Sequence, residues 1–252
     1  MSHTSEKETY CKGGHTVLLL HEVHRVVGAK EDAFDDAYRD EFMPALAKSD
    51  GSRLLWYLRL SHGSGQAYTV VSITGCRDAQ AWEELSERVR VGDLAEWSSE
   101  VDAMRHASEA KIIRPVPWSP LQELDFSSVP VHGETHKNSL FMEDTAWPFK
   151  GGLQAYLAKA GTLYDHTLSS QKEEGIGMIE LEAAFQPVFG THQTTEVILW
   201  QRVVNTKAVM WMLGHDLPPE ASAPGTWLHD ALEVRDRWES RLLRSAAWSP
   251  LY

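Results

Sequence analysis

The sequence predicts an α+β fold built from two similar halves, and two observations support this prediction. The first is the tetrapeptide Trp-Ser-Pro-Leu, which begins at Trp118 and recurs at Trp248, 130 positions later. The second is that a similar order of predicted elements precedes each copy. Repetition on this scale indicates a duplicated unit. We expect each copy to close the end of its own sheet.

The first half predicts the order strand, helix, strand, strand, helix, strand. Apolar and β-branched residues predict strands, and apolar residues at helical spacing predict helices. Pro44 should kink or shorten the first helix, and Asp78 is a suitable N-cap for the second. The predicted elements are strand 16–27, helix 31–48, strands 53–61 and 67–74, a helix after Asp78, a helical segment 94–110 and a short strand 111–117.

The second half follows a polar segment and begins the same order again. Its last strand is the weakest, because Ser245 to Trp248 has little β character. The predicted elements are strand 139–147, a helix opened by Gly151 and Gly152, strands 178–185 and 195–203 around a hairpin loop 190–194, helix 206–213 and a long helix 225–247.

Two β-α-β-β-α-β units are the pattern of tandem ferredoxin-like repeats. Each unit covers one face of its sheet with helices, and packing the two sheets face to face buries the other faces. We divide the chain into a disordered tail (1–14), a first repeat (15–121), a linker (122–138) and a second repeat (139–252).

Composition excludes several classes of function. The net charge of −12 disfavours nucleic acid and anionic membrane surfaces as partners. No long uncharged apolar run predicts a membrane span, and the polar start predicts no signal peptide. Cys11 and Cys76 form no motif. We therefore expect a cytoplasmic protein in a reducing environment.

One segment of the second half resembles a known family. Glu143-Asp-Thr-Ala-Trp-Pro148, followed by Gly151 and an amphipathic helix, is similar to the start of many NIPSNAP-like domains. With the paired ferredoxin-like units, the chain resembles the dimeric α+β barrel superfamily. That superfamily includes cofactor-free monooxygenases, lyases, dehydratases, cyclases and haem enzymes, so the resemblance implies a fold rather than one activity.

The first strands of the two halves carry the candidate catalytic residues. Aligning these strands pairs His21 with Glu143 and Glu22 with Asp144, in each case directly after an apolar run. Charge at such a place is unfavourable unless it is paired or solvated in a cavity. Glu22 and His24 share a strand face and could form an acid–base dyad in which the carboxylate sets the imidazole tautomer. The alternative is that these residues mark where the strand leaves the core and meets water.

Metal and haem sites find less support. His21, Glu22 and His24 could ligate a metal, but His21 and His24 point to opposite faces of a regular strand. The chain has no haem-attachment motif, phosphate-binding glycine loop, serine-hydrolase elbow or activated thiol. We therefore expect no cofactor and no metal.

These observations predict a cofactor-independent acid–base enzyme, of lyase, dehydratase, isomerase or monooxygenase type. It would act on an apolar or aromatic small molecule, with Trp147, Phe185 and Trp200 as substrate-binding candidates unless they are core residues. One alternative is a non-catalytic ligand-binding or interaction protein, and another is a haem or metal enzyme. Assembly into a homodimer stays open.

Overall fold

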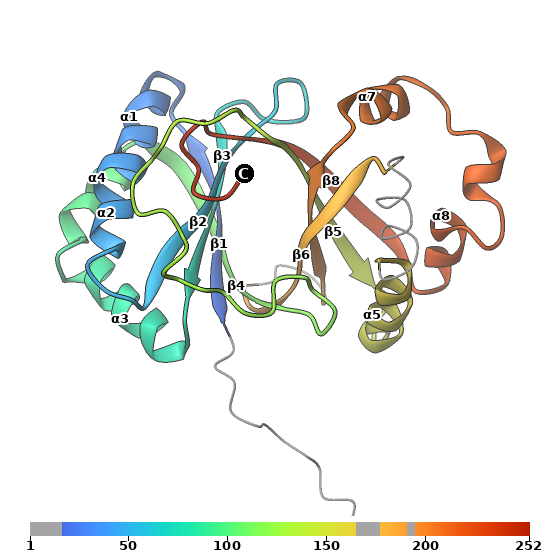
Figure 1. Cartoon of the computed structure of the whole chain (residues 1–252), viewed down its shortest axis with the longest axis horizontal. Helices are drawn as coiled ribbons and strands as arrows, with labels where there is room; N and C mark the ends of the chain where they lie inside the picture. Colours follow the sequence, from blue (N-terminus) through green and yellow to red (C-terminus); the bar gives the residue numbers. More distant parts are fainter. Residues whose placement is uncertain (1–16, 165–176, 191–194) are drawn as a thin grey trace, which may run out of the picture.

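A computed structural model describes residues 17–164, 177–190 and 195–252, so the expected tail and most of the expected hairpin loop 190–194 lie outside the described residues. Eight described strands form a closed antiparallel barrel in the order β1-β3-β2-β8-β5-β7-β6-β4. Helices α1 to α4 lie outside one side of the barrel, and α5, α7 and α8 lie outside the other (Figure 1). The predicted α+β class and the dimeric α+β barrel architecture are confirmed.

The first half supplies the strand order β4-β1-β3-β2. Asp78 caps α3 as predicted, because its side chain accepts a hydrogen bond from the Ala81 amide at 2.8 Å. The elements are β1 Leu18–Val26, 3-10 helix η1 Gly28–Lys30, α1 Glu31–Asp36, π-helix η2 Ala37–Phe42, α2 Met43–Leu46, β2 Ser52–Leu60, β3 Thr69–Cys76, α3 Ala79–Arg90, α4 Ala95–Ala103 and β4 Arg105–Pro115.

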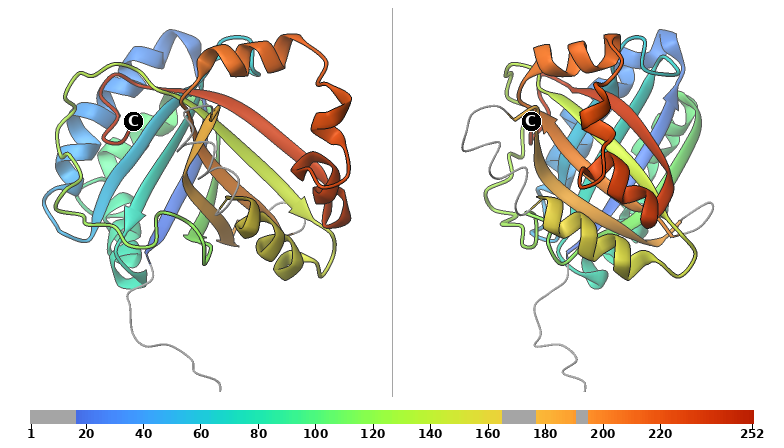
Figure 2. Two further views of the ribbon diagram at one scale, coloured as in Figure 1. Left: turned by 45° about the vertical axis from the view of Figure 1, so that its right-hand side comes forward. Right: turned by 90° about the vertical axis from the view of Figure 1, so that its right-hand side faces the viewer.

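The second half repeats that order as β8-β5-β7-β6. Figure 2 shows its helices outside the barrel wall. The elements are β5 Leu140–Pro148, α5 Leu153–Thr162, β6 Ile179–Phe189, β7 Val197–Val203, α7 Thr206–Gly214, 3-10 helix η4 Pro219–Ser222, α8 Trp227–Asp230, 3-10 helix η5 Ala231–Glu233 and β8 Arg235–Ser245.

Sequence reasoning found only the end of the fourth strand in the first half, predicted as 111–117, and missed the fourth strand of the second half. The later part of the predicted helix 225–247, from Arg235 to Ser245, is β8, and the end of the predicted helix 94–110 belongs to β4. The strand β4 pairs with β1 from Arg105, but with β6 only from Ile112. Its first part therefore has one neighbour and mostly exposed side chains, so it lacks the alternation that reveals a strand. Sheet pairing here overrides helix propensity.

The helix around Pro44 is also irregular, as predicted. Pro44 lies in the first turn of α2, directly after the π-helix Ala37–Phe42. Proline has no N–H to donate to the preceding turn, and wider turns of this kind often mark an interrupted helix. This irregular stretch carries Tyr38, which becomes important below.

Two seams close the barrel by joining the halves. The strand β2 pairs with β8 around Arg59 and Arg244, and β4 pairs with β6 around Arg114 and Gln186. In each seam the second strand of one half meets the fourth strand of the other. The sheets therefore do more than stack, because their edges are hydrogen-bonded and no long open edge remains between them.

Both copies of the Trp-Ser-Pro-Leu repeat form hydrogen bonds across these seams. The Ser119 hydroxyl accepts a hydrogen bond from the Ala184 amide at 2.9 Å, and the Ser249 hydroxyl accepts one from the Tyr57 amide at 3.0 Å. Trp248 packs in the core of the first half, with its ring centroid 4.6 Å from that of Tyr57. The expectation that each copy closes its own sheet was wrong, because each copy closes the opposite half.

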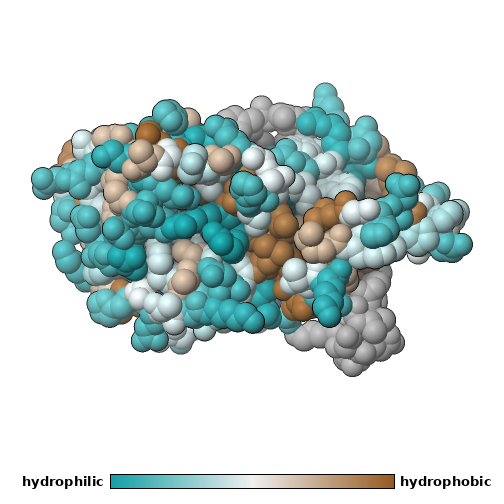
Figure 3. Space-filling view, turned by 90° about the horizontal axis from the view of Figure 1, so that it is seen from above, coloured by the Kyte–Doolittle hydropathy of each residue, from teal (hydrophilic) through white to brown (hydrophobic). Residues whose placement is uncertain are grey.

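The surface is mainly hydrophilic when seen from above, with hydrophobic residues gathered in a smaller area (Figure 3). Within the described residues, no helix combines the length and the apolar character needed to cross a membrane.

Candidate active site

The structure separates the candidate acid–base residues by strand face. On β1, His21 points into the barrel between Leu19 and Val23, whereas Glu22 and His24 point outward toward α1 to α4. On β5, Glu143 is buried in contact with His21. Asp144 faces the opposite way, as strand alternation requires.

A cavity of about 130 Å³ lies between β1 and the helices of the first half. Its polar lining residues are Glu22, Tyr38 and Arg105, together with Ser86 and Ser98. The walls are mainly apolar, and they include Leu20, Phe42, Trp82, Leu85, Trp97 and Val101. An apolar cavity with a few convergent polar groups is the usual form of a small-molecule site.

His24 is fully buried at the base of this site. Its Nδ1 lies 2.8 Å from Nη1 of Arg105, which can only donate, so Nδ1 accepts and Nε2 carries the proton. Nε2 lies 3.1 Å from both the Ser72 hydroxyl and the Tyr38 hydroxyl. Burial and the nearby Arg105 lower the pKa of His24 to about 3. The ring is therefore neutral at physiological pH.

The tautomer of His24 determines whether the Tyr38 hydroxyl donates or accepts in their hydrogen bond. Because Nε2 already carries a proton, the Tyr38 hydroxyl cannot donate to the ring, and its proton is left for another acceptor. Burial and the nearby Glu22 raise the pKa of Tyr38 well above its usual value. Tyr38 therefore stays protonated and suits the role of a neutral hydrogen-bond or proton donor.

Glu22 supplies the complementary acceptor. It is half-buried, and among the described residues no hydrogen bond or ion pair holds its carboxylate. Burial raises the pKa of Glu22, and the positive charge of Arg105 opposes this rise. The predicted dyad needs one correction, because Arg105 rather than Glu22 sets the tautomer of His24.

His21 and Glu143 form a separate pair inside the barrel. Their Nε2 and Oε1 atoms lie 3.3 Å apart, and both side chains are 2% exposed. These two atoms do not form a hydrogen bond with each other. Among the described residues, both His21 nitrogens and Oε2 of Glu143 are buried without a hydrogen-bond partner. Burial would raise the pKa of Glu143, but His21, Arg241 and Lys111 together lower it to about 2. This carboxylate is ionised and joins the two halves.

Asp144 occupies the position in the second half that Glu22 occupies in the first. Its carboxylate accepts hydrogen bonds from the Ser240 hydroxyl at 2.5 Å and from the Gln201 amide at 3.0 Å. Burial raises the pKa of Asp144, and these hydrogen bonds oppose the rise. Asp144 is therefore held by the fold, whereas Glu22 is not.

The substrate-binding candidates lie away from the cavity beside Glu22. Phe185 and Trp200 are fully buried in the barrel core, and Trp147 lies under the guanidinium of Arg237, 4.9 Å from its ring. None of them lines the cavity.

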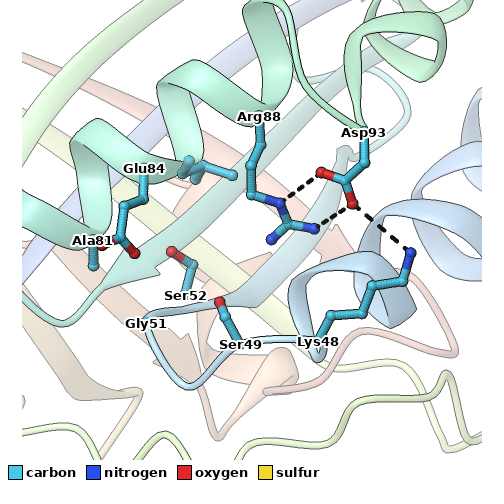
Figure 4. Close-up of a pocket in the computed structure, with 9 residues that line it drawn as sticks. Lys48, Ser49, Gly51, Ser52, Ala81, Glu84, Arg88 and Asp93 are labelled. Carbon is cyan, nitrogen blue, oxygen red and sulfur yellow. Dashed lines mark hydrogen bonds and ion pairs between the residues drawn. The ribbon is translucent and has the colours of Figure 1, made fainter.

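Two larger hollows on the surface have paired charges. The one in Figure 4, about 200 Å³, contains Arg88 and Lys48, which both pair with Asp93. Another, about 390 Å³, contains Asp35, which accepts hydrogen bonds from Tyr57 and Arg59. The charges named here pair with one another, whereas the Glu22 carboxylate has no such partner among the described residues, so the smaller cavity beside Glu22 is the better candidate. In the part of the chain that the structure describes, no three His, Cys, Asp or Glu side chains converge as a metal site would need.

Sequence reasoning missed Tyr38, Ser72 and Arg105 as members of the site. Tyr38 reads as one more apolar residue of a helix, and Arg105 lies in a segment that was predicted as helix. One signal was available. Arg105 and Arg235 are 130 positions apart, as are Lys111 and Arg241, the same spacing as the two Trp-Ser-Pro-Leu copies.

Comparison with known proteins supports the fold. No protein-family model matches the chain, and no curated protein matches its sequence. A candidate monooxygenase from Fusobacterium nucleatum has a similar structure, with a TM-score of 0.58, 9% identity and coverage of 92% of this chain and 93% of that one. An anthrone oxidase-like protein matches with a TM-score of 0.57, 9% identity and 92% coverage of each chain.

A NIPSNAP family protein from Agrobacterium tumefaciens also matches, at a TM-score of 0.37 and 19% identity, over 42% of this chain and 98% of that one. At the identities of the two full-length matches, the likeness establishes a shared fold. The chain is therefore a dimeric α+β barrel built within one polypeptide.

Proposed function

We propose that this protein is a cofactor-independent acid–base enzyme whose active site is the cavity of the first half. Its substrate is an apolar or aromatic small molecule, and the reaction is of lyase, dehydratase, isomerase or monooxygenase type. The observation that carries the proposal is the unpaired carboxylate of Glu22 facing an apolar cavity beside Tyr38. The likeness in fold to a candidate monooxygenase and an anthrone oxidase-like protein agrees with it.

Each polar residue of this site has its own role in the proposed reaction. Glu22 removes a proton from the bound molecule, because a carboxylate with a raised pKa is a stronger base than one in water. Tyr38 donates to the oxygen on which negative charge develops. His24 and Arg105 orient Tyr38, and the apolar walls exclude water.

Proton exchange tests the proposal without a known substrate. Small aromatic ketones and phenols would be incubated with the protein in D₂O, and exchange of carbon-bound hydrogen would be followed by NMR. We expect exchange with the wild type, loss in Glu22→Gln and retention in the matched variant Asp144→Asn. Exchange that survives Glu22→Gln would contradict the proposal.

Two further measurements separate the alternatives. Binding without exchange or turnover would favour a non-catalytic ligand-binding protein. An absorption spectrum and metal analysis of the purified protein would reveal a haem or metal enzyme.

A further inference from the structure

We infer that the cavity takes a molecule with one aromatic ring and one hydroxyl group, a phenol-type compound. This inference rests on the proposed function only in using the same cavity, because size and polarity argue for the ligand independently of any reaction.

Size limits the ligand to one ring. The cavity is about 130 Å³, and an apolar protein cavity of about 150 Å³ accommodates benzene. Trp82, Trp97 and Phe42 supply flat walls for such a ring, since aromatic side chains pack well in offset or edge-to-face arrangements. A bicyclic or tricyclic compound exceeds this space.

Polarity selects a hydroxyl group. The cavity offers the Tyr38 hydroxyl as a donor and the Glu22 carboxylate as an acceptor. Two serines also line it: the Ser86 hydroxyl donates to the Trp82 carbonyl at 2.9 Å, and Ser98 adds a further hydroxyl. Arg105 is already engaged, because Nη1 contacts His24 at 2.8 Å and Nε donates to Asp102 at 2.9 Å. A hydroxyl can accept from Tyr38 and donate to Glu22 at once. A carboxylate would be repelled by Glu22, and an ammonium could not accept from Tyr38.

Calorimetric titration of the full chain tests this ligand class with phenol, benzene and 1-naphthol. We expect phenol to bind about 10-fold more tightly than benzene, because it adds hydrogen bonds to a charged acceptor. We expect no saturable binding of 1-naphthol. Tyr38→Phe should reduce the preference for phenol over benzene.

A matched pair of variants places the binding in this cavity. Ser98 lines the cavity, whereas the adjacent Ser99 on α4 is exposed and does not. Ser98→Phe should abolish phenol binding and Ser99→Phe should preserve it, with Ser98→Leu as the substitute if Ser98→Phe does not fold. Phenol binding that survives filling the cavity, equal affinity for 1-naphthol, or no phenol binding by the wild type would overturn the inference.

The outcomes also separate this inference from the proposed enzyme. Phenol binding without proton exchange would remove the proposed activity and leave the ligand class standing. Proton exchange on a bicyclic compound without phenol binding would overturn the ligand class and leave the proposed activity standing.

Discussion

At the scale of single residues, the site depends on how burial divides neighbouring ionisable groups. His24 and Glu22 are two positions apart on the same strand face. His24 is enclosed by hydrogen-bond partners, whereas the Glu22 side chain faces the cavity. Desolvation acts on both side chains, and it favours the neutral form of each. This explains why a neutral histidine lies beside a carboxyl whose pKa is raised.

His24 should make stability depend on pH. Its pKa is about 3 in the folded protein against an ordinary 6.5, so acidification protonates the ring in the unfolded chain first. His24 therefore stabilises the fold fully above pH 6.5, and roughly 2 to 3 kcal/mol should be lost between pH 6.5 and 4.5. Urea unfolding across this range should show a flatter dependence for His24→Gln. The exposed His106→Gln should keep the wild-type slope, and an unchanged slope in His24→Gln would contradict the prediction.

The pKa of Glu22 should respond in opposite directions to two neighbouring substitutions. Arg105 lowers this pKa and Asp102 raises it. Arg105→Met should therefore raise the pKa of Glu22, and Asp102→Asn should lower it. Carbon-13 NMR titration of the Glu22 carboxyl measures both shifts without a substrate. Shifts of the same sign would show that these charges do not act on Glu22 as described.

At the scale of elements, the contacts between strands explain which polar groups are structural. His21 and Glu143 come from β1 and β5, and Lys111 of β4 pairs with Glu196 at 2.5 Å just before β7. Both pairs cross from one half to the other. Charges buried in this way are most unfavourable when only one partner remains.

The pair in the barrel should therefore show strong coupling. Glu143→Leu should cost roughly 3 kcal/mol of unfolding free energy, because it leaves the buried His21 ring without its partner in the barrel. The double variant His21→Leu with Glu143→Leu should be more stable than Glu143→Leu alone. Denaturant unfolding measures the cycle, and exposed Glu87→Leu serves as the control. Additive effects of the two substitutions would rule out the coupling.

The serines of the repeated tetrapeptide should matter equally in both halves. Ser119 and Ser249 each accept from a buried amide of the opposite half. Ser119→Ala and Ser249→Ala should each cost about 1 to 3 kcal/mol, because the amide loses its acceptor. Exposed Ser99→Ala should change stability by less than about 0.5 kcal/mol. Thermal unfolding measures all three, and a neutral Ser249→Ala would contradict the crosswise role.

At the scale of the whole molecule, the barrel makes one unit of the two halves. The seams β2–β8 and β4–β6 join the halves, and Trp118 and Trp248 each pack against the core of the opposite half, so neither half has a complete core of its own. Unfolding of one half therefore exposes apolar surface of the other. Whether two such chains associate into a homodimer stays a prediction, which sedimentation velocity at graded concentrations checks.

Thermal unfolding should consequently be a single transition. We expect the calorimetric and van't Hoff enthalpies to agree. Trp248→Ala should cost about 3 to 5 kcal/mol and lower that one transition as a whole, although Trp248 ends the second half and packs in the first. Two separate transitions, in the wild type or in Trp248→Ala, would show that the halves fold independently.

The sequence by itself determined the duplication and most of the element order, and it directed attention to the first strands. These features are local, since periodicity and a repeated tetrapeptide need no knowledge of distant contacts. The start of β4 and the whole of β8 escaped prediction, because their pairing partners lie far away in the chain. The β1 segment around His21, Glu22 and His24 was found from sequence. The sequence did not show that one face of this strand meets Glu143 inside the barrel and the other meets the helices of the first half.

Only the tertiary structure decided which residues act together. It set His21 against Glu143 inside the barrel and brought Tyr38 and Arg105 to His24 from positions 14 and 81 residues away. It also left Glu22 unpaired at a cavity while Ser240 and Gln201 hold the equivalent Asp144. The physical reason is that burial, pKa and hydrogen-bond partners depend on packing between distant segments, which local sequence patterns do not encode.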